Sequence, residues 1–316
     1  MKVMLPIDVS IGDIVSTNVT ITETLWLVGS TYAIGEQVYK GIFVYESAIG
    51  SNIGNNPELT SGGVSINNDW LNAGFTPIAS PKWLIVGMIN KMRMFDGYVS
   101  TYTSKTTSID VTIQKPYIGT MYLLGMEASS ILVQVLNSTG GVLWQSTTLP
   151  IVDLISDYYD WFFSNPPAPR QAIRIELGLT TGATDKLRLY VTGSGTVKVG
   201  KVCVGSSIAL GTIQWGVNDT ILDWSKVITD DFGQSFLKQG RYVPEINATA
   251  QMLSIAESDL ACTVLNELRA TGIVCDLNEN ELDYPSLITY CVLSERTRSL
   301  NAYGDTTIKF KLTGLV

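Results

Sequence analysis

The chain has 316 residues, enough for about two to three domains of ordinary size. Only 16% of the residues are charged and the formal net charge is -8, which argues against a protein that binds duplex DNA through clustered Lys and Arg. The sequence contains no histidine, and this excludes Ser-His-Asp triads, Cys-His pairs and metal sites built on histidine ligands.

Four cysteines are present, at Cys203, Cys262, Cys275 and Cys291. None forms a C-x-x-C pair, and three of them have valine neighbours, so we expect buried free thiols in a reducing compartment. A disulfide between two of the last three is the alternative. Because the chain also lacks a nucleotide-binding fingerprint, it is predicted to need neither a metal nor an organic cofactor.

Targeting and membrane segments are not expected. The apolar run after Lys2 ends at Pro6, which is too short for a signal peptide. The longest uncharged window, 128–152, contains the turn-forming residues Asn137–Gly141 in its middle. It therefore predicts two strands and a turn rather than a membrane span.

Taken in chain order, the sequence predicts four segments. Residues 1–22 form a Thr-rich arm with no core of its own, which should lie along another surface of this chain or of a neighbour. Residues 23–90 combine many aromatics with frequent Gly and Asn, as expected of a small β module whose core is built from a few rings.

Residues 91–205 have the strand spacing of an antiparallel β-sandwich of jelly-roll type. Turns are predicted at Ser138–Gly141 and Gly193–Gly195. An aromatic-rich loop, Asp153–Pro169, interrupts the strands, and a loop of this length is usually functional or packs on a partner. The expected strands are Ser108–Gln114, Thr120–Gly125, Ile131–Leu136, Gly141–Gln145, Ala172–Leu177, Leu187–Thr192 and Thr196–Val204.

Residues 206–316 predict an α+β domain for docking or assembly, with one helix on a mostly antiparallel sheet. Ser254 and Glu257 match an N-terminal capping box, and Ser258, one turn later, is the alternative cap. Leu260, Val264 and Leu268 recur at helical spacing. The expected strands are Gly211–Val217, Ile221–Val227, Gly240–Leu253, Leu287–Ser294 and Thr306–Thr313.

Acidic residues offer the remaining route to enzyme chemistry. Asp153, Asp157 and Asp160 lie close together in the sequence, and two carboxylates about 5–9 Å apart can hydrolyse a glycosidic bond. No second signature accompanies them, so the chain is predicted not to be an enzyme. Asp230 and Asp231 are interpreted as a solvated turn, with a loosely bound cation as the alternative.

The aromatic pattern of residues 23–90 resembles the small chitin- and cellulose-binding modules of carbohydrate-binding module families 5 and 12. The matching places are held by Trp26, Tyr32, Gly35, Val38, Phe43, Tyr45, Asn52, Pro57, Trp83 and Gly87. Two departures are Glu36, where the family usually has Asp, and an insertion at Gly62–Asn72 that carries Trp70.

The resemblance implies a carbohydrate-binding surface made of exposed aromatic rings, for which Tyr32, Trp70 and Trp83 are the candidates. Flat rings bind sugars because the C–H faces of a pyranose are apolar and stack on them. Trp70 is expected to be the most exposed of the three, because its insertion is polar. The alternative is that these rings form the core of the module.

Several motifs along the chain resemble a group of bacteriophage tail proteins. These motifs are Met1–Val9, Ser16–Val19, Asn90–Gly97 and Thr229–Gly233. The order of parts also matches: arm, carbohydrate-binding-like module, sandwich, α+β end. The resemblance implies a structural protein of the virion tail, at the tail tip or a fibre-attachment point, made in the host bacterial cytoplasm and lacking enzymatic activity.

The expected partners follow from this resemblance and from the low content of charged residues. Plentiful apolar residues with few charges usually mark an interface, so we expect a symmetric homo-oligomer in contact with other tail proteins. Host surface polysaccharide is a further expected partner. The alternative is a soluble glycan-binding adhesin, which needs no special docking domain at its end.

Overall fold

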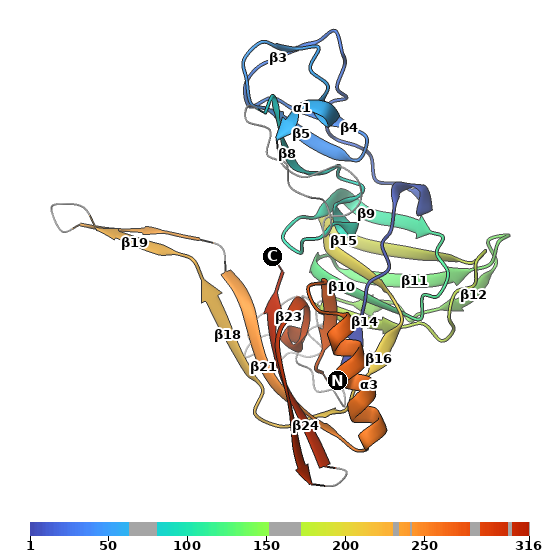
Figure 1. The fold of residues 1–316 in the computed structure, drawn as a ribbon. Coiled ribbons are helices and arrows are strands. Elements are labelled where there is room, and N and C mark those ends of the chain that lie inside the picture. Colours follow the sequence, from blue (N-terminus) through green and yellow to red (C-terminus); the bar gives the residue numbers. More distant parts are fainter. Residues whose placement is uncertain are drawn as a thin grey trace, which may run out of the picture.

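The computed structural model describes residues 1–62, 81–151, 172–229, 234–240, 242–278, 285–302 and 305–315. The described part is mainly β, with mostly antiparallel sheets and a helix lying on a sheet near the C-terminus, which confirms the predicted fold class. Figure 1 shows the small module at the top, the sandwich beside and below it, and the C-terminal domain at the bottom.

The module contains a four-stranded sheet in the order β4-β5-β8-β7 and a separate β3-β6 pair. Its elements are β3 (Thr31–Tyr32), β4 (Gln37–Lys40), β5 (Phe43–Ser47), β6 (Asn52–Ile53), α1 (Pro57–Thr60), β7 (Ser61–Gly62) and β8 (Trp83–Met88). A core of aromatic and aliphatic side chains holds it together. The buried members of this core are Tyr32, Val38, Phe43, Tyr45 and Trp83.

The motif Asn90–Gly97 joins the module to the sandwich. The Asn90 side chain accepts a bond from Ser104 N (2.9 Å) and donates one to Ser104 O (2.9 Å). Asp96, which is 4% exposed, accepts bonds from Tyr98 N and the Thr101 hydroxyl. The Lys201 ammonium donates to the Asp96 carbonyl. These buried polar groups are hydrogen-bonded as burial requires, so the motif has a structural role at this junction.

The sandwich encloses one large apolar core. Its strands are β9 (Thr103–Ile113), β10 (Thr120–Glu127), β11 (Ser130–Leu136), β12 (Val142–Gln145), β13 (Leu149–Pro150), β14 (Ala172–Glu176) and β15 (Lys186–Gly205). The first half of β15 lies between β11 and β9. Its second half pairs with β10 from Lys198 to Gly205, and β9 continues beside it as far as Val199. Strand β15 therefore connects β11 at one end to β10 at the other, with β9 alongside its middle.

The predicted turn at Gly193–Gly195 is wrong. The residues lie inside the single strand β15, where the register with β9 shifts between Thr192 and Thr196. The facing strand has Thr107 at a φ of 68°, an uncommon conformation for a residue other than glycine. Glycines in a strand interior mark such bulges as readily as they mark turns, and here they let the strand bend.

The N-terminal arm lies against two other parts of this chain. Its first strand, β1 (Lys2–Met4), is inserted between β16 (Ser207–Ala209) and β22 (Ile273–Asp276) of the C-terminal domain. Its second strand, β2 (Ile14–Thr17), pairs with β9 of the sandwich. The arm thus completes two sheets that are otherwise built from distant sequence.

The C-terminal sheet has the order β16-β1-β22-β23-β24-β21-β17, and β18 also pairs with β21. Its remaining elements are β17 (Thr212–Ile213), β18 (Asn218–Asp223), β19 (Lys226–Thr229), β20 (Ser235–Lys238), β21 (Tyr242–Met252), α3 (Ile255–Glu267), β23 (Ile288–Ala302) and β24 (Asp305–Gly314). Strand β22 is absent from the sequence prediction. Within the described residues, no helix is both long and apolar enough to span a membrane.

Helix α3 begins where the capping box predicts. The Ser254 side chain accepts a bond from Glu257 N at 3.1 Å. The predicted apolar face is shifted, because Leu260 is 52% exposed. The residues that face the sheet are Ser258, Ala261, Leu265 and Leu268. A Ser and an Ala take part because small side chains let the helix approach the sheet closely.

The four cysteines are free thiols, and Cys203, Cys275 and Cys291 are buried. Burial raises the pKa of the Cys203 thiol to about 11. A hydrogen bond to Cys291, together with burial, raises the pKa of Cys275.

Since the thiolate is the reactive form, we expect an aromatic disulfide reagent at pH 8 to modify one thiol per native chain, the half-buried Cys262. The variant Cys262→Ser should remove this reaction, and faster modification of a second thiol would contradict the prediction.

Candidate interaction surfaces

Two of the three rings predicted to bind carbohydrate belong to the core of the module. Trp83 is 0% exposed and Tyr32 is 4% exposed. Their rings pack edge to face, with centroids 5.3 Å apart. The Trp83 Nε1–H donates to Asn55 O at 3.0 Å, and the Tyr32 hydroxyl accepts from Leu27 N at 2.7 Å. Neither ring presents a face on which a sugar could stack.

The third candidate, Trp70, lies outside the described residues, and so do Asp153, Asp157, Asp160, Asp230 and Asp231. Among the residues that are described, no three acidic or cysteine side chains gather where they could hold a metal ion. Trp26 is a half-buried ring of the module, and the Lys40 ammonium lies 4.6 Å from its centroid. Asn56 and Glu58 hold that ammonium in place, so a cation already covers this face of the ring.

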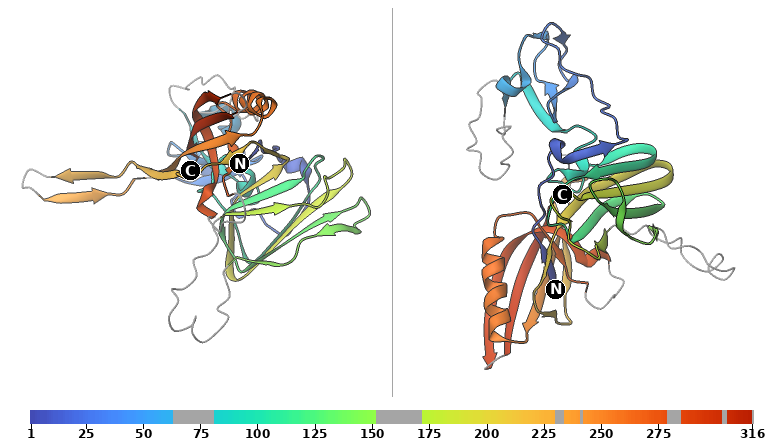
Figure 2. Two further views of the ribbon diagram at one scale, coloured as in Figure 1. Left: turned by 90° about the horizontal axis from the view of Figure 1, so that it is seen from below. Right: turned by 90° about the vertical axis from the view of Figure 1, so that its right-hand side faces the viewer.

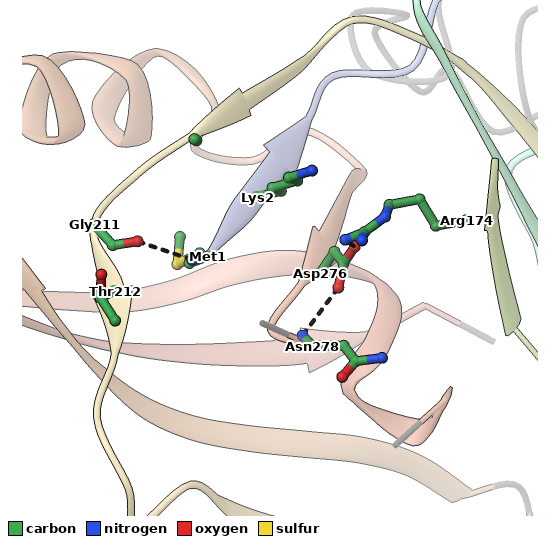
Figure 3. Close-up of a pocket in the computed structure, with 8 residues that line it drawn as sticks. Met1, Lys2, Arg174, Gly211, Thr212, Asp276 and Asn278 are labelled. Carbon is green, nitrogen blue, oxygen red and sulfur yellow. Dashed lines mark hydrogen bonds and ion pairs between the residues drawn. The ribbon is translucent and has the colours of Figure 1, made fainter. Parts of the chain in front are cut away.

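A polar cavity of about 350 Å³ lies where the arm, the sandwich and the C-terminal domain meet. Figure 3 shows Arg174 and Asp276 in contact with each other on one side of it, with Met1 and Gly211 on the other side. The Met1 ammonium donates to Gly211 O at 2.9 Å. Burial lowers the pKa of this ammonium to about 6, although Asp276 partly opposes the shift.

The charged groups around the cavity already have partners within the chain. Arg174 donates to Asp276 Oδ2 at 2.6 Å, and the Tyr122 hydroxyl donates to the same oxygen at 3.2 Å. Lys2 forms an ion pair with Glu176. Arg174 and Tyr122 belong to the sandwich and Asp276 to the C-terminal domain, so this buried cluster fixes the two domains to each other. The ion pairs and hydrogen bonds of this cluster therefore have a structural role.

An exposed apolar surface lies on a β-hairpin that leaves the C-terminal sheet. At its base, β18 pairs with β21 from Asn218↔Asn247 to Asp223↔Tyr242, and every residue of β18 is exposed. Beyond the base, β19 and β20 pair with each other and with no other described strand. Figure 1 and the left view of Figure 2 show this hairpin extending far from the rest of the chain.

The outer part of the hairpin is apolar on both faces. Val227 opposes Leu237 and Ile228 opposes Phe236, and these side chains are 68%, 76%, 51% and 57% exposed, in that order. Neighbouring residues on a strand point to opposite faces, so each face carries one of the two pairs. An isolated two-stranded hairpin is marginal in water, and here no described residue covers either face.

One face of the hairpin also carries two directly opposed lysines. Lys226 pairs in register with Lys238, and both lie on the side of Ile228 and Phe236. We call these four residues the cationic face. Like charges directly across a strand pair are destabilising, and no described carboxylate lies within ion-pair distance of either ammonium. The opposite face has Thr229 and Ser235, whose hydroxyls are 3.1 Å apart.

No family model matches the chain, and no curated protein matches it. A solved structure, the lectin domain of lectinolysin complexed with Lewis B antigen, is 14% identical. The match covers 36% of this chain and 82% of that chain, with a TM-score of 0.24. At this TM-score the likeness carries no conclusion about fold or function.

Sequence reasoning missed the hairpin because it placed a single strand at 221–227 and began the next at 240. The signal was present in two short apolar runs, Val227–Ile228 and Phe236–Leu237, on either side of the turn-forming stretch Thr229–Gly233. Two such runs around a turn predict a hairpin. The pattern does not indicate that the described part of the chain places no core beneath the hairpin.

Proposed function

We propose that this chain is a structural subunit of a bacteriophage tail, which assembles with copies of itself and with other tail proteins. The observation that carries the proposal is the projecting hairpin 218–242 with apolar pairs exposed on both faces. A large exposed apolar surface on one element usually marks an interface.

A rough energy supports this use of the hairpin. Burying a fully exposed side chain such as Val, Leu, Ile or Phe contributes about 1.5–3 kcal/mol. The four side chains of the outer hairpin are between 51% and 76% exposed, so burying what they still expose would contribute roughly 4–8 kcal/mol. The entropy lost when two proteins associate costs about 4–15 kcal/mol. One hairpin therefore stabilises a complex only together with other contacts, as in a multi-subunit assembly.

Three further features fit a tail subunit. The chain resembles bacteriophage tail proteins in several ordered motifs, and the motif Asn90–Gly97 has a structural role here. The buried cluster around Asp276 fixes the sandwich to the C-terminal domain, and a fixed arrangement of domains suits a structural subunit. The burial of Tyr32 and Trp83 removes two of the three rings on which an adhesin would depend, and glycan contact through Trp70 stays a prediction.

Replacing residues 224–241 with Asn-Gly tests the proposal. Asp223 and Tyr242 are directly opposite each other, so a two-residue turn can close the shortened hairpin. In sedimentation velocity, we expect the full chain to form oligomers and the shortened chain to sediment as a monomer with unchanged circular dichroism. Oligomers of the same size in both would contradict the assembly role of the hairpin.

The placement in a tail has its own test. Gold-labelled antibodies raised against the purified chain should decorate the tails of phage particles that contain it, at the tip or at a fibre-attachment point. Labelling of the capsid alone, or absence of the chain from purified particles, would contradict a tail subunit.

A further inference from the structure

Helix α3 exposes a second unusual surface on the C-terminal domain. Its outer side carries Ile255 (46% exposed) and Leu260 (52% exposed), together with the exposed acids Asp259 and Glu267. We call these four residues the acidic face. Over its 13 residues, the helix contains three acids and no base. The third acid, Glu257, accepts bonds from Gly211 N and Leu253 N and belongs to the helix cap.

We infer that the cationic face of the hairpin binds the acidic face of helix α3 on a second copy of this chain. The inference rests on the proposed function and names the partner surface of the hairpin. Each face combines two exposed apolar side chains with two exposed charges, and the charges have opposite signs. Such complementarity selects the partner and the register of a contact.

The carboxylates of Asp259 and Glu267 are accessible to a partner chain. The Asp259 carboxylate is 2.8 Å from Arg298 Nη1 but keeps 63% of its side chain exposed. Glu267 forms no ion pair within the described part of the chain. On the hairpin, a carboxylate from a neighbour would lie near the opposed Lys226 and Lys238 and relieve their repulsion.

The arrangement in space allows this contact to repeat. Figure 1 and the left view of Figure 2 place the hairpin and α3 on opposite flanks of the C-terminal domain. A hairpin on one flank that binds a helix on the other makes a head-to-tail contact, which closes into a ring or continues as a filament. Residues 218–229 span roughly 40 Å when extended, which exceeds the ~30 Å width of a small domain.

Charge reversal of the two faces tests the contact in the full chain. The hairpin variant is Lys226→Glu/Lys238→Glu, which keeps two like charges opposed and so leaves the intrinsic stability of the hairpin little changed. The helix variant is Thr263→Lys/Glu267→Lys, at two exposed positions. It leaves Asp259 paired with Arg298, and the new lysine at position 263, one turn from Asp259, makes the net charge of the acidic face positive. The control is Lys82→Glu/Lys186→Glu. It changes the net charge by the same amount as the hairpin variant, but on the module and the sandwich.

By sedimentation velocity, we expect either reversed variant alone to assemble roughly tenfold to a hundredfold more weakly than the wild type. The control should assemble like the wild type. An equimolar mixture of the two reversed variants should recover assembly, because every hairpin then meets a helix of opposite charge. A chain carrying both reversals should also recover it.

Two outcomes separate the contact from the proposed function. If the shortened hairpin is monomeric but charge reversal has no effect, or the mixture does not recover, the hairpin binds elsewhere and the inference is overturned while the assembly role stands. If the wild type itself is monomeric at all concentrations, both are overturned.

Discussion

Val3→Asp is expected to lower the free energy of unfolding by about 3–5 kcal/mol. Val3 is 1% exposed and belongs to the core of the C-terminal domain, while its strand β1 pairs with β16 on one side and β22 on the other. A carboxylate at this position would be buried without a partner. Urea denaturation followed by circular dichroism measures the change.

Leu5→Asp provides the matched control, because Leu5 lies two residues away and is 52% exposed. We expect it to change the free energy of unfolding by no more than about 0.5 kcal/mol. Equal losses in the two variants would mean that β1 is not inserted in the sheet as described. Val3→Ala should fall between them, since it removes apolar contact without burying a charge.

Asp276→Ala is expected to cost about 3–5 kcal/mol of stability, because it leaves the Arg174 guanidinium without its buried partner. The Asp276 side chain is 0% exposed and accepts bonds from both Arg174 and Tyr122. Differential scanning calorimetry of the full chain should show a lower transition temperature. If the cluster joins the two domains, the sandwich and the C-terminal domain should also cease to unfold together.

Two further variants distinguish a lost partner from lost packing. Arg174→Met/Asp276→Leu removes both charges, so it should cost less than Asp276→Ala alone. Glu176→Gln weakens the exposed pairs of Glu176 with Lys2 and Arg174 and leaves Asp276 in place, so it should cost less than about 1 kcal/mol. A double variant that is less stable than Asp276→Ala would contradict the importance of the ion pair.

Local sequence patterns predicted much of the sandwich correctly. Strands such as β10, β11 and β14 begin and end within a few residues of their predicted limits. In β11 buried residues alternate with half-buried ones, whereas β10 begins with a continuous buried run, and both patterns are typical of strands. The cap of α3 followed from Ser254 and Glu257. The bend in β15 did not, because glycine permits a turn and a bulge equally, and the pairing with β9 decides between them.

The candidate surfaces were harder to predict, since exposure depends on what lies opposite a residue. The spacing of Tyr32 and Trp83 identified two important rings, but the same spacing suits a core ring and a binding ring. Leu260 fits a helical stripe, yet the sheet meets the neighbouring stripe of Ala261 and Leu265. The outer hairpin is exposed because no described element packs on it, and a local sequence pattern does not indicate this.

The position of β1 has a consequence for how the chain folds during synthesis. Met4 pairs with Val274, so during synthesis strand β1 can pair only after a segment about 270 residues later has been made. At roughly 5–20 residues per second, this delay is about 15–50 s. The sheet that bears the hairpin therefore closes late, by a contact of high sequence separation, and such contacts fold slowly. A nascent chain consequently carries its finished module and sandwich for some time before it can present a complete surface to its neighbours.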